Sequence, residues 1–221
     1  VEPAEIFALA EKTMGSIPAQ PAPRPITTKE PEQMGERRVS LVREAESPII
    51  IFAHHAFSGS DKDAPAAELL MSILADGNSS RLYQQLVAQQ QLVLEVGQFM
   101  NAGFDPGLAY LYATLPAGGD LAVVEKVLNA ELLKISTQGV SEAELNKART
   151  QKLAGFWRGL ATISGKAQAL GTYEVFAGDF KKLFQAPADY EKVTVADLQR
   201  IAKKLFQANN RTVGIVLPLT K

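Results

Sequence analysis

Two predicted helices meet in the stretch Asp76-Gly77-Asn78-Ser79-Ser80-Arg81-Leu82-Tyr83-Gln84-Gln85-Leu86. Upstream of it, apolar residues recur at helical spacing from a candidate N-cap at Asp63 as far as Gly77, which is expected to end the first helix. Downstream, Ser79 or Ser80 is the expected cap of a second, amphipathic helix. The stretch therefore predicts a sharp break, with the glycine ending one helix and a serine beginning the next.

Extended segments flank these helices on both sides. Residues 38–43 and 48–57 are predicted strands joined by a polar turn. Both faces of the second strand are apolar, which indicates a central strand covered on at least part of each side. Residues 92–100 and 108–115 are predicted to form a hairpin, because the turn between them contains glycine, asparagine, aspartate and proline.

The second half of the chain is mainly helical. Asp120 is the expected N-cap of a helix over residues 121–135, which closes at Gly139. The capping box Ser141-Glu142-Ala143-Glu144 opens a helix that is expected to continue to Ile163. Gly165 should break it before a third helix.

That third helix is predicted over residues 167–176, and Thr194-Val195-Ala196-Asp197 caps a further one. Residues 211–217 form a last predicted strand. Strands grouped in pairs with helices between them predict an α+β fold, an antiparallel sheet with helices packed mainly on one face.

The chain is expected to have three parts. Residues 1–18 carry an amphipathic helix, residues 19–34 form a proline-rich linker, and residues 35–221 form the main domain. Prolines at this density fix φ and remove amide donors, so the linker is expected to be extended.

Composition excludes several classes of partner. A net charge of -1 lacks the concentrated basic face that nucleic acid or an anionic membrane requires. No apolar run is long enough to span a membrane. The absence of cysteine removes disulfides and thiolate chemistry, suits the bacterial periplasm and is equally compatible with the cytoplasm.

No catalytic centre can be recognised in the residues. His54 and His55 are neighbours in a predicted strand, so they point to opposite faces and cannot bind one metal ion. They are expected to be half-buried, one hydrogen-bonded inside and one exposed to water; the alternative is that one imidazole faces an active-site chamber. Ser58 and Ser60 lack the strand–turn–helix context of a nucleophilic serine and are interpreted as loop residues.

Gly77-Asn78-Ser79-Ser80-Arg81-Leu82, followed by a helix and a strand, resembles the pitrilysin/insulinase family of zinc peptidases, which includes the mitochondrial processing peptidases. The resemblance extends to a late helix between Tyr190 and Asn210 and to a closing strand over residues 211–218. Residues 1–18 are similar to the last helix of the preceding zinc-binding domain. The chain therefore resembles the C-terminal, inactive domain of a family member, with a processing-peptidase-like fold.

The resemblance implies that the zinc site lies elsewhere. Family peptidases bind zinc through an inverted His-x-x-Glu-His motif and a later glutamate in the N-terminal domain, and this chain has no such motif. No catalytic residue, metal ligand or cofactor is therefore expected here, and zinc is expected in an upstream domain. The motif residues from Gly77 to Leu82, Arg81 included, have a sufficient structural role as helix ends, caps and hydrogen-bond donors.

A second implication concerns substrate binding. Active members carry an arginine and a tyrosine seven positions apart that hold the substrate backbone, and the matching positions are Val87 and Leu94. This domain is therefore not expected to hold substrate in the usual way. Such a loss fits the zinc-bearing chain of a two-subunit enzyme, completed by a homologous second subunit or a second copy, and it also fits an inactive family member.

The function expected from the resemblance is that of a non-catalytic wall of a peptide-enclosing chamber and subunit interface. The parent protein would be a zinc metalloendopeptidase, a hydrolase that acts on peptides. The alternative is a structural assembly subunit with no peptidase role.

Overall fold

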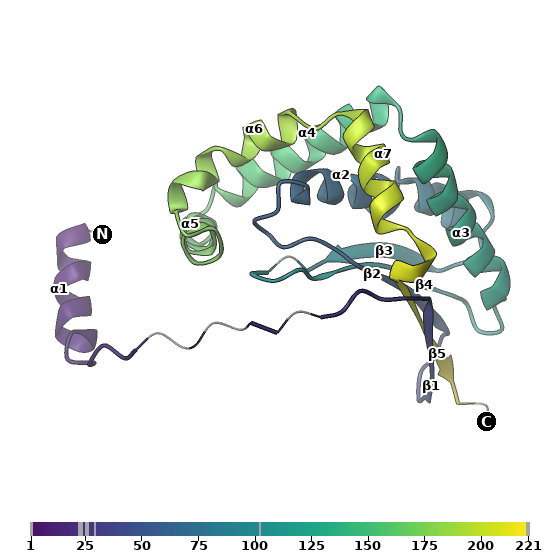
Figure 1. The fold of residues 1–221 in the computed structure, drawn as a ribbon, viewed down its shortest axis with the longest axis horizontal. Coiled ribbons are helices and arrows are strands. Elements are labelled where there is room, and N and C mark those ends of the chain that lie inside the picture. Colours follow the sequence, from purple (N-terminus) through teal and green to yellow (C-terminus); the bar gives the residue numbers. More distant parts are fainter. Residues whose placement is uncertain (1, 22–23, 25–26, 29, 102, 220–221) are drawn as a thin grey trace. The chain divides into compact units, whose positions relative to one another are not determined.

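A computed structural model describes residues 2–21, 24, 27–28, 30–101 and 103–219, which form two compact units, 1–32 and 33–221 (Figure 1). The first unit contains α1 (Pro3–Met14), with proline in its first turn and Gly15 at its end. No residue of α1 is buried, and Ile6, Phe7, Leu9 and Met14 expose half or more of their surface. The predicted amphipathic helix is present, with its apolar residues uncovered.

The second unit is built on one five-stranded sheet. Its strands are β1 (Arg37–Arg43), β2 (Ile49–His55), β3 (Glu95–Met100), β4 (Leu108–Thr114) and β5 (Arg211–Pro218), in the order β1-β5-β2-β4-β3. The predicted hairpin β3–β4 is confirmed as an antiparallel pair, and β2 is central.

The C-terminal strand lies between the first two. β5 pairs in parallel with β1 and antiparallel with β2, so the strands joined by the polar turn are not hydrogen-bonded to each other. Residues 44–48 therefore bridge two strand spacings, about 10 Å. Insertion of β5 places Val213 opposite Phe52 in the core, a pairing between residues too distant in sequence for local patterning to reveal.

Helices cover one face of this sheet, as predicted (Figure 1). α2 (Ala64–Ala75), α3 (Leu121–Gln138) and α7 (Val195–Leu205) pack over it, and α4 (Glu142–Gly159) packs against α2. Alternate strand residues fill the core between sheet and helices, among them Ile50, Phe52, Leu111 and Val213, which are fully buried. The α+β class with helices on one face is confirmed, but the sheet is mixed and not wholly antiparallel, because β1 and β5 run parallel.

Three predicted helix caps form as expected. The carboxylate of Asp120 accepts hydrogen bonds from the amides of Ala122 and Val123, at 2.9 and 3.2 Å. Reciprocal capping boxes join Ser141 to Glu144 and Thr194 to Asp197. These bonds link residues two or three apart, so the local sequence suffices to specify them.

One other predicted cap and one predicted helix boundary are wrong, although α2 does begin directly after Asp63. Asp63 precedes α2 but does not cap it, because its carboxylate accepts hydrogen bonds from the guanidinium of Arg200 at 2.8 and 2.9 Å. α4 ends at Gly159, and Gly165 lies in the first turn of α5 (Ile163–Ala177), where its amide donates to Thr162. A Cβ at residue 165 would collide with the carbonyl oxygen of Gly159, so the glycine permits the tight turn between helices instead of breaking one.

Four short helices complete the described structure. They are η1 (Tyr83–Gln89), η2 (Phe180–Phe184), α6 (Ala186–Glu191) and η3 (Ala208–Asn210). η1 is a π-helix that follows the Ser-Ser-Arg-Leu motif, and η2 and α6 connect α5 to α7.

Candidate functional site

Arg81 is the centre of a hydrogen-bond network between three elements. Its guanidinium donates to Glu144 at 2.6 and 3.0 Å, to Glu131 at 3.0 Å and to the carbonyl oxygen of Gly139 at 3.2 Å. Hydrogen bonding to Glu144 raises the pKa of Arg81, and Arg81 lowers the pKa of Glu144 to about 2. Glu131 is almost completely buried, so the arginine supplies the charge that its burial requires. Arg81 thus holds the start of η1 against α3 and α4.

The residues around Arg81 also have structural contacts. Gly77 has φ +72°, a left-handed conformation that favours glycine after a helix. Ser80 does not cap η1 with its side chain; its hydroxyl instead donates to the carbonyl oxygen of Gly77 at 2.8 Å. The carbonyl oxygen of Ser79 accepts from Lys147 at 2.9 Å, and Leu82 is fully buried in the core. The expected serine cap is therefore replaced by a hydrogen bond that closes the turn.

Val87 and Leu94 occupy different environments. Val87 is partly buried against the core at the end of η1. Leu94 precedes β3, has 62% of its surface exposed and donates its backbone amide to Thr114 at 2.7 Å. Neither side chain has a hydrogen-bonding group, so these positions cannot hold a peptide backbone by side-chain hydrogen bonds.

The two histidines differ sharply. His54 is 1% exposed and packs edge-on against the ring of Phe206, with centroids 5.2 Å apart. Neither of its ring nitrogens has a hydrogen-bond partner in the described part of the chain, so the expected internal hydrogen bond is absent. Burial, together with the positive charge of Arg211, lowers the pKa of His54 to about 3.

His55 is partly exposed on the opposite face of β2. The two imidazoles therefore point away from each other, as the strand geometry requires. Over residues 30–101 and 103–219, and in the described parts of the first unit, no group of three or more histidines and carboxylates is arranged to hold a metal ion. The residues present do not fit the zinc ion that the resemblance associates with the family.

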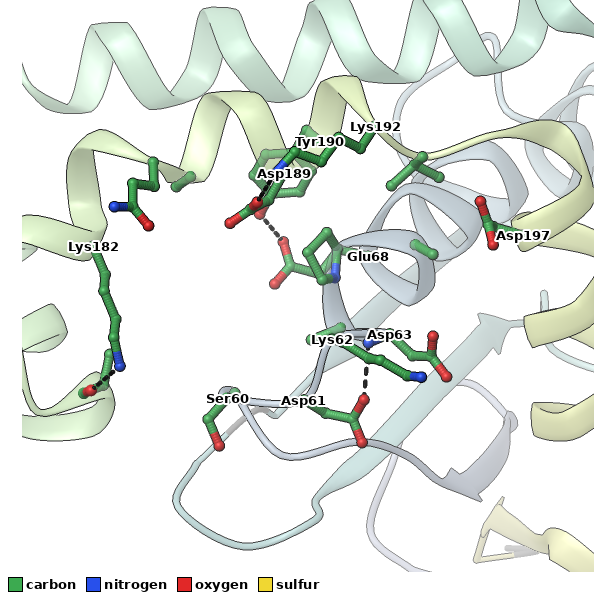
Figure 2. Close-up of a pocket in the computed structure, with 18 of the residues that line it drawn as sticks. Ser60, Asp61, Lys62, Asp63, Glu68, Lys182, Asp189, Tyr190, Lys192 and Asp197 are labelled. Carbon is green, nitrogen blue, oxygen red and sulfur yellow. Dashed lines mark hydrogen bonds and ion pairs between the residues drawn. The ribbon is translucent and has the colours of Figure 1, made fainter.

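A cavity of about 710 Å³ opens between the loop before α2 and the α5–α6 region (Figure 2). Glu68 and Tyr190 point toward each other across one wall, and the tyrosine hydroxyl donates to the carboxylate at 2.6 Å. Lys152 forms an ion pair with the same carboxylate and lies over the Tyr190 ring. Burial, and then the charge of Glu68, raises the pKa of Tyr190, which therefore keeps its proton.

Several other charged groups around this cavity form ion pairs. Arg200 binds Asp63 and Asp197, and Lys192 binds Asp189. These contacts join α2, α4, α6 and α7. Sequence reasoning did not find this cluster, because Glu68 and Tyr190 are 122 positions apart; the one signal was the match of Tyr190 to the late-helix pattern.

The sheet face opposite the helices carries apolar and aromatic side chains. We call it the open face and define it by Val39, Leu41, Ile49, Ile51, Phe99, Tyr110 and Tyr112, none of which is fully buried. No helix that the structure describes in the second unit lies on it (Figure 1).

The β3–β4 hairpin gives the open face its aromatic side chains. The rings of Phe99 and Tyr110 lie 6.3 Å apart, and the hydroxyl of Tyr112 donates to Glu95 at 3.0 Å. A Cβ at Gly97 would collide with the Tyr112 ring, so the glycine lets that ring lie across β3. The hairpin therefore presents its aromatic rings in a defined arrangement on the surface.

Among the described helices, none is long and apolar enough to cross a membrane.

The sequence model of the Peptidase M16 inactive domain matches residues 1–152. The zinc protease PqqE of Helicobacter pylori is 24% identical over 222 residues, an alignment that covers 97% of this chain and 49% of that protein.

Solved structures share the fold. A protease from Helicobacter pylori superposes with a TM-score of 0.89 at 23% identity, covering 99% of this chain and 53% of that one. An inactive peptidase domain from Bordetella parapertussis has a TM-score of 0.73 at 30% identity, covering 82% of this chain and 96% of that one. The chain thus spans about half of the two Helicobacter proteins and nearly the whole of the isolated Bordetella domain.

Proposed function

Because the chain belongs to the Peptidase M16 inactive-domain family, we propose that it is the non-catalytic C-terminal domain of a zinc metalloendopeptidase and forms one wall of a chamber that encloses peptides. The observation that carries this proposal is the one-sided sheet. Helices cover one face and bury the side chains of its central strands, while the open face keeps apolar and aromatic side chains accessible.

An open face of this kind suits an unfolded peptide. Monomeric proteins rarely leave a contiguous apolar surface uncovered unless it contacts another molecule. Phe99, with 59% of its surface exposed, together with Tyr110 and Tyr112 offers broad contact area without a deep, residue-specific pocket. Such a surface supports contact with many apolar side chains, which is what a wall of a degradation chamber requires.

Peptide hydrolysis is assigned to another part of the assembly. His54 is buried and His55 lies on the opposite face of the sheet, which supports a zinc site outside this domain. Zinc chemistry is proposed for an upstream domain, and α1 for the last helix of that domain. Val87 and Leu94 cannot supply the backbone clamp by their side chains, so we propose that a homologous second subunit, or a second copy, supplies it.

Peptide hydrolysis by the full-length parent protein tests the proposal. The parent is assayed with and without its neighbouring homologous chain, and with and without a chelator. We expect activity that the chelator abolishes, and we expect the 221-residue chain alone to bind no stoichiometric zinc and to cleave no peptide. Peptidase activity or one equivalent of zinc in the chain alone would contradict the proposal.

A structural assembly subunit is the second candidate. The apolar residues Val87 and Leu94 at the clamp positions favour it, because a domain without a peptidase role has no need of the clamp. Absence of activity in every combination of the parent and its partner would select this candidate.

We also propose a periplasmic location, which a chain without cysteine suits.

A further inference from the structure

β1 is an edge strand whose outer side pairs with no strand that the structure describes. It pairs only with β5, and all seven of its residues are exposed. Val39, Leu41 and Val42 keep 51%, 45% and 59% of their surface accessible. A strand edge with free backbone groups and exposed apolar side chains is a template for the addition of another strand.

The charges of β1 are arranged symmetrically on the open face. Strand pairing places Arg37, Val39, Leu41 and Arg43 on the same face as Ile51 of β2. Two arginines therefore flank two apolar residues, and about 20 Å of strand separates the arginines.

Neither of these arginines is neutralised within the described chain. The side chains of Arg37 and Arg43 form no hydrogen bond or ion pair with residues that the structure describes. Glu36, adjacent to Arg37, binds Arg38 and Arg211 instead. Glu125 is likewise taken by Arg38, at 2.6 Å. The two ends of β1 consequently present positive charge to whatever lies beside the strand.

We propose that the outer edge of β1 binds an extended polypeptide segment in which two acidic residues flank two apolar residues, in the pattern acidic-x-apolar-x-apolar-x-acidic. Backbone hydrogen bonds extend the sheet, the apolar residues pack beside Val39 and Leu41, and the carboxylates lie opposite Arg37 and Arg43. The pattern reads the same in both directions, so it suits a parallel or an antiparallel strand. This inference does not depend on the proposed peptidase role.

A second copy of β1 does not fit this edge. Antiparallel pairing centred on Ser40 would place Arg37 opposite Arg43 twice, and parallel pairing in register would place each arginine opposite itself. Like charges directly opposite each other destabilise a strand pair. The charge pattern therefore selects an acidic partner over self-association.

The test uses the 221-residue chain and a fluorescein-labelled peptide, Glu-Thr-Val-Thr-Val-Thr-Glu, with a matched peptide in which both glutamates are lysine. Fluorescence anisotropy at low salt should show saturable binding of the acidic peptide and at least tenfold weaker binding of the basic one. Hydrogen exchange should show new protection of the β1 amides in the presence of the acidic peptide.

The variant Arg37→Glu/Arg43→Glu reverses both charges. It should weaken binding of the acidic peptide about tenfold, because two cross-strand attractions become repulsions. It should gain binding of the basic peptide, because the two repulsions with that peptide become attractions. Lys166→Glu/Lys203→Glu makes the same change of net charge at exposed helical positions and should leave both affinities unchanged.

Gain of binding to the basic peptide is a result that loss of folding cannot produce. Equal binding of the two peptides, an unchanged affinity in the β1 variant, or no saturable binding would overturn the proposal. In the last case the arginines would only protect the strand edge from aggregation.

Discussion

His54 should make the stability of this domain strongly dependent on pH. The imidazole is 1% exposed, its nitrogens have no partner in the described chain, and burial lowers its pKa from 6.5 to about 3. The unfolded chain therefore binds a proton at this residue between pH 6.5 and pH 3, while the folded chain does not. Above pH 6.5 the imidazole is neutral in both states and His54 does not reduce the free energy of unfolding. As the pH falls below 6.5, the free energy of unfolding decreases.

The size of this effect follows from the shift in pKa. Each pH unit below 6.5 costs about 1.4 kcal/mol, so a fall to pH 5 should remove about 2 kcal/mol of the free energy of unfolding. That amount is a substantial fraction of the stability of an ordinary domain.

The perturbation is His54→Leu, which removes the ionisable group and keeps an apolar side chain beside Phe206. Urea unfolding followed by circular dichroism at pH 7.5, 6 and 5 measures the free energy of unfolding of both proteins. The leucine variant should gain about 2 kcal/mol relative to the wild type as the pH falls from 7.5 to 5. Carboxylates titrate in both proteins, so their contribution cancels in this difference.

His55→Asn is the matched control, because His55 lies on the opposite face of the same strand and the substitution leaves His54 intact. The pH dependence of its stability should follow that of the wild type. A difference between His54→Leu and wild type that stays constant from pH 7.5 to pH 5 would refute the reasoning.

Three further predictions concern stability in urea at pH 7.5. Arg81→Met should cost about 3 kcal/mol because it leaves Glu131 buried without a counter-charge. Adding Glu131→Leu should recover most of this loss, and no recovery would show that the ion pair is not the cause. Tyr190→Phe should cost about 1.5 kcal/mol through loss of the 2.6 Å hydrogen bond to Glu68. If the charge of Glu68 carries the effect, the same substitution should cost nothing in a protein that already carries Glu68→Gln. Gly97→Ala should cost about 1–3 kcal/mol, since the added methyl group collides with the tyrosine ring that crosses β3; an unchanged midpoint would contradict this contact.

The sequence by itself determined the local structure of this protein. The caps at Asp120, Ser141 and Thr194 formed as predicted because each joins groups two or three residues apart. Apolar residues on both faces identified the central strand, and the turn residues after residue 100 identified the hairpin. Family membership was also predictable, because the Ser-Ser-Arg-Leu motif and its surroundings lie within one continuous stretch.

Tertiary structure alone decided which distant groups meet. The carboxylate of Asp63 binds Arg200, 137 positions away, instead of capping α2, because a bidentate ion pair satisfies the carboxylate better than a helix amide does. β5 lies between β1 and β2. Phe206, at the end of α7, packs against His54, whose ring nitrogens are buried without a hydrogen-bond partner among the described residues. Such contacts depend on the three-dimensional path of the chain, and no local periodicity encodes which residues that path brings together.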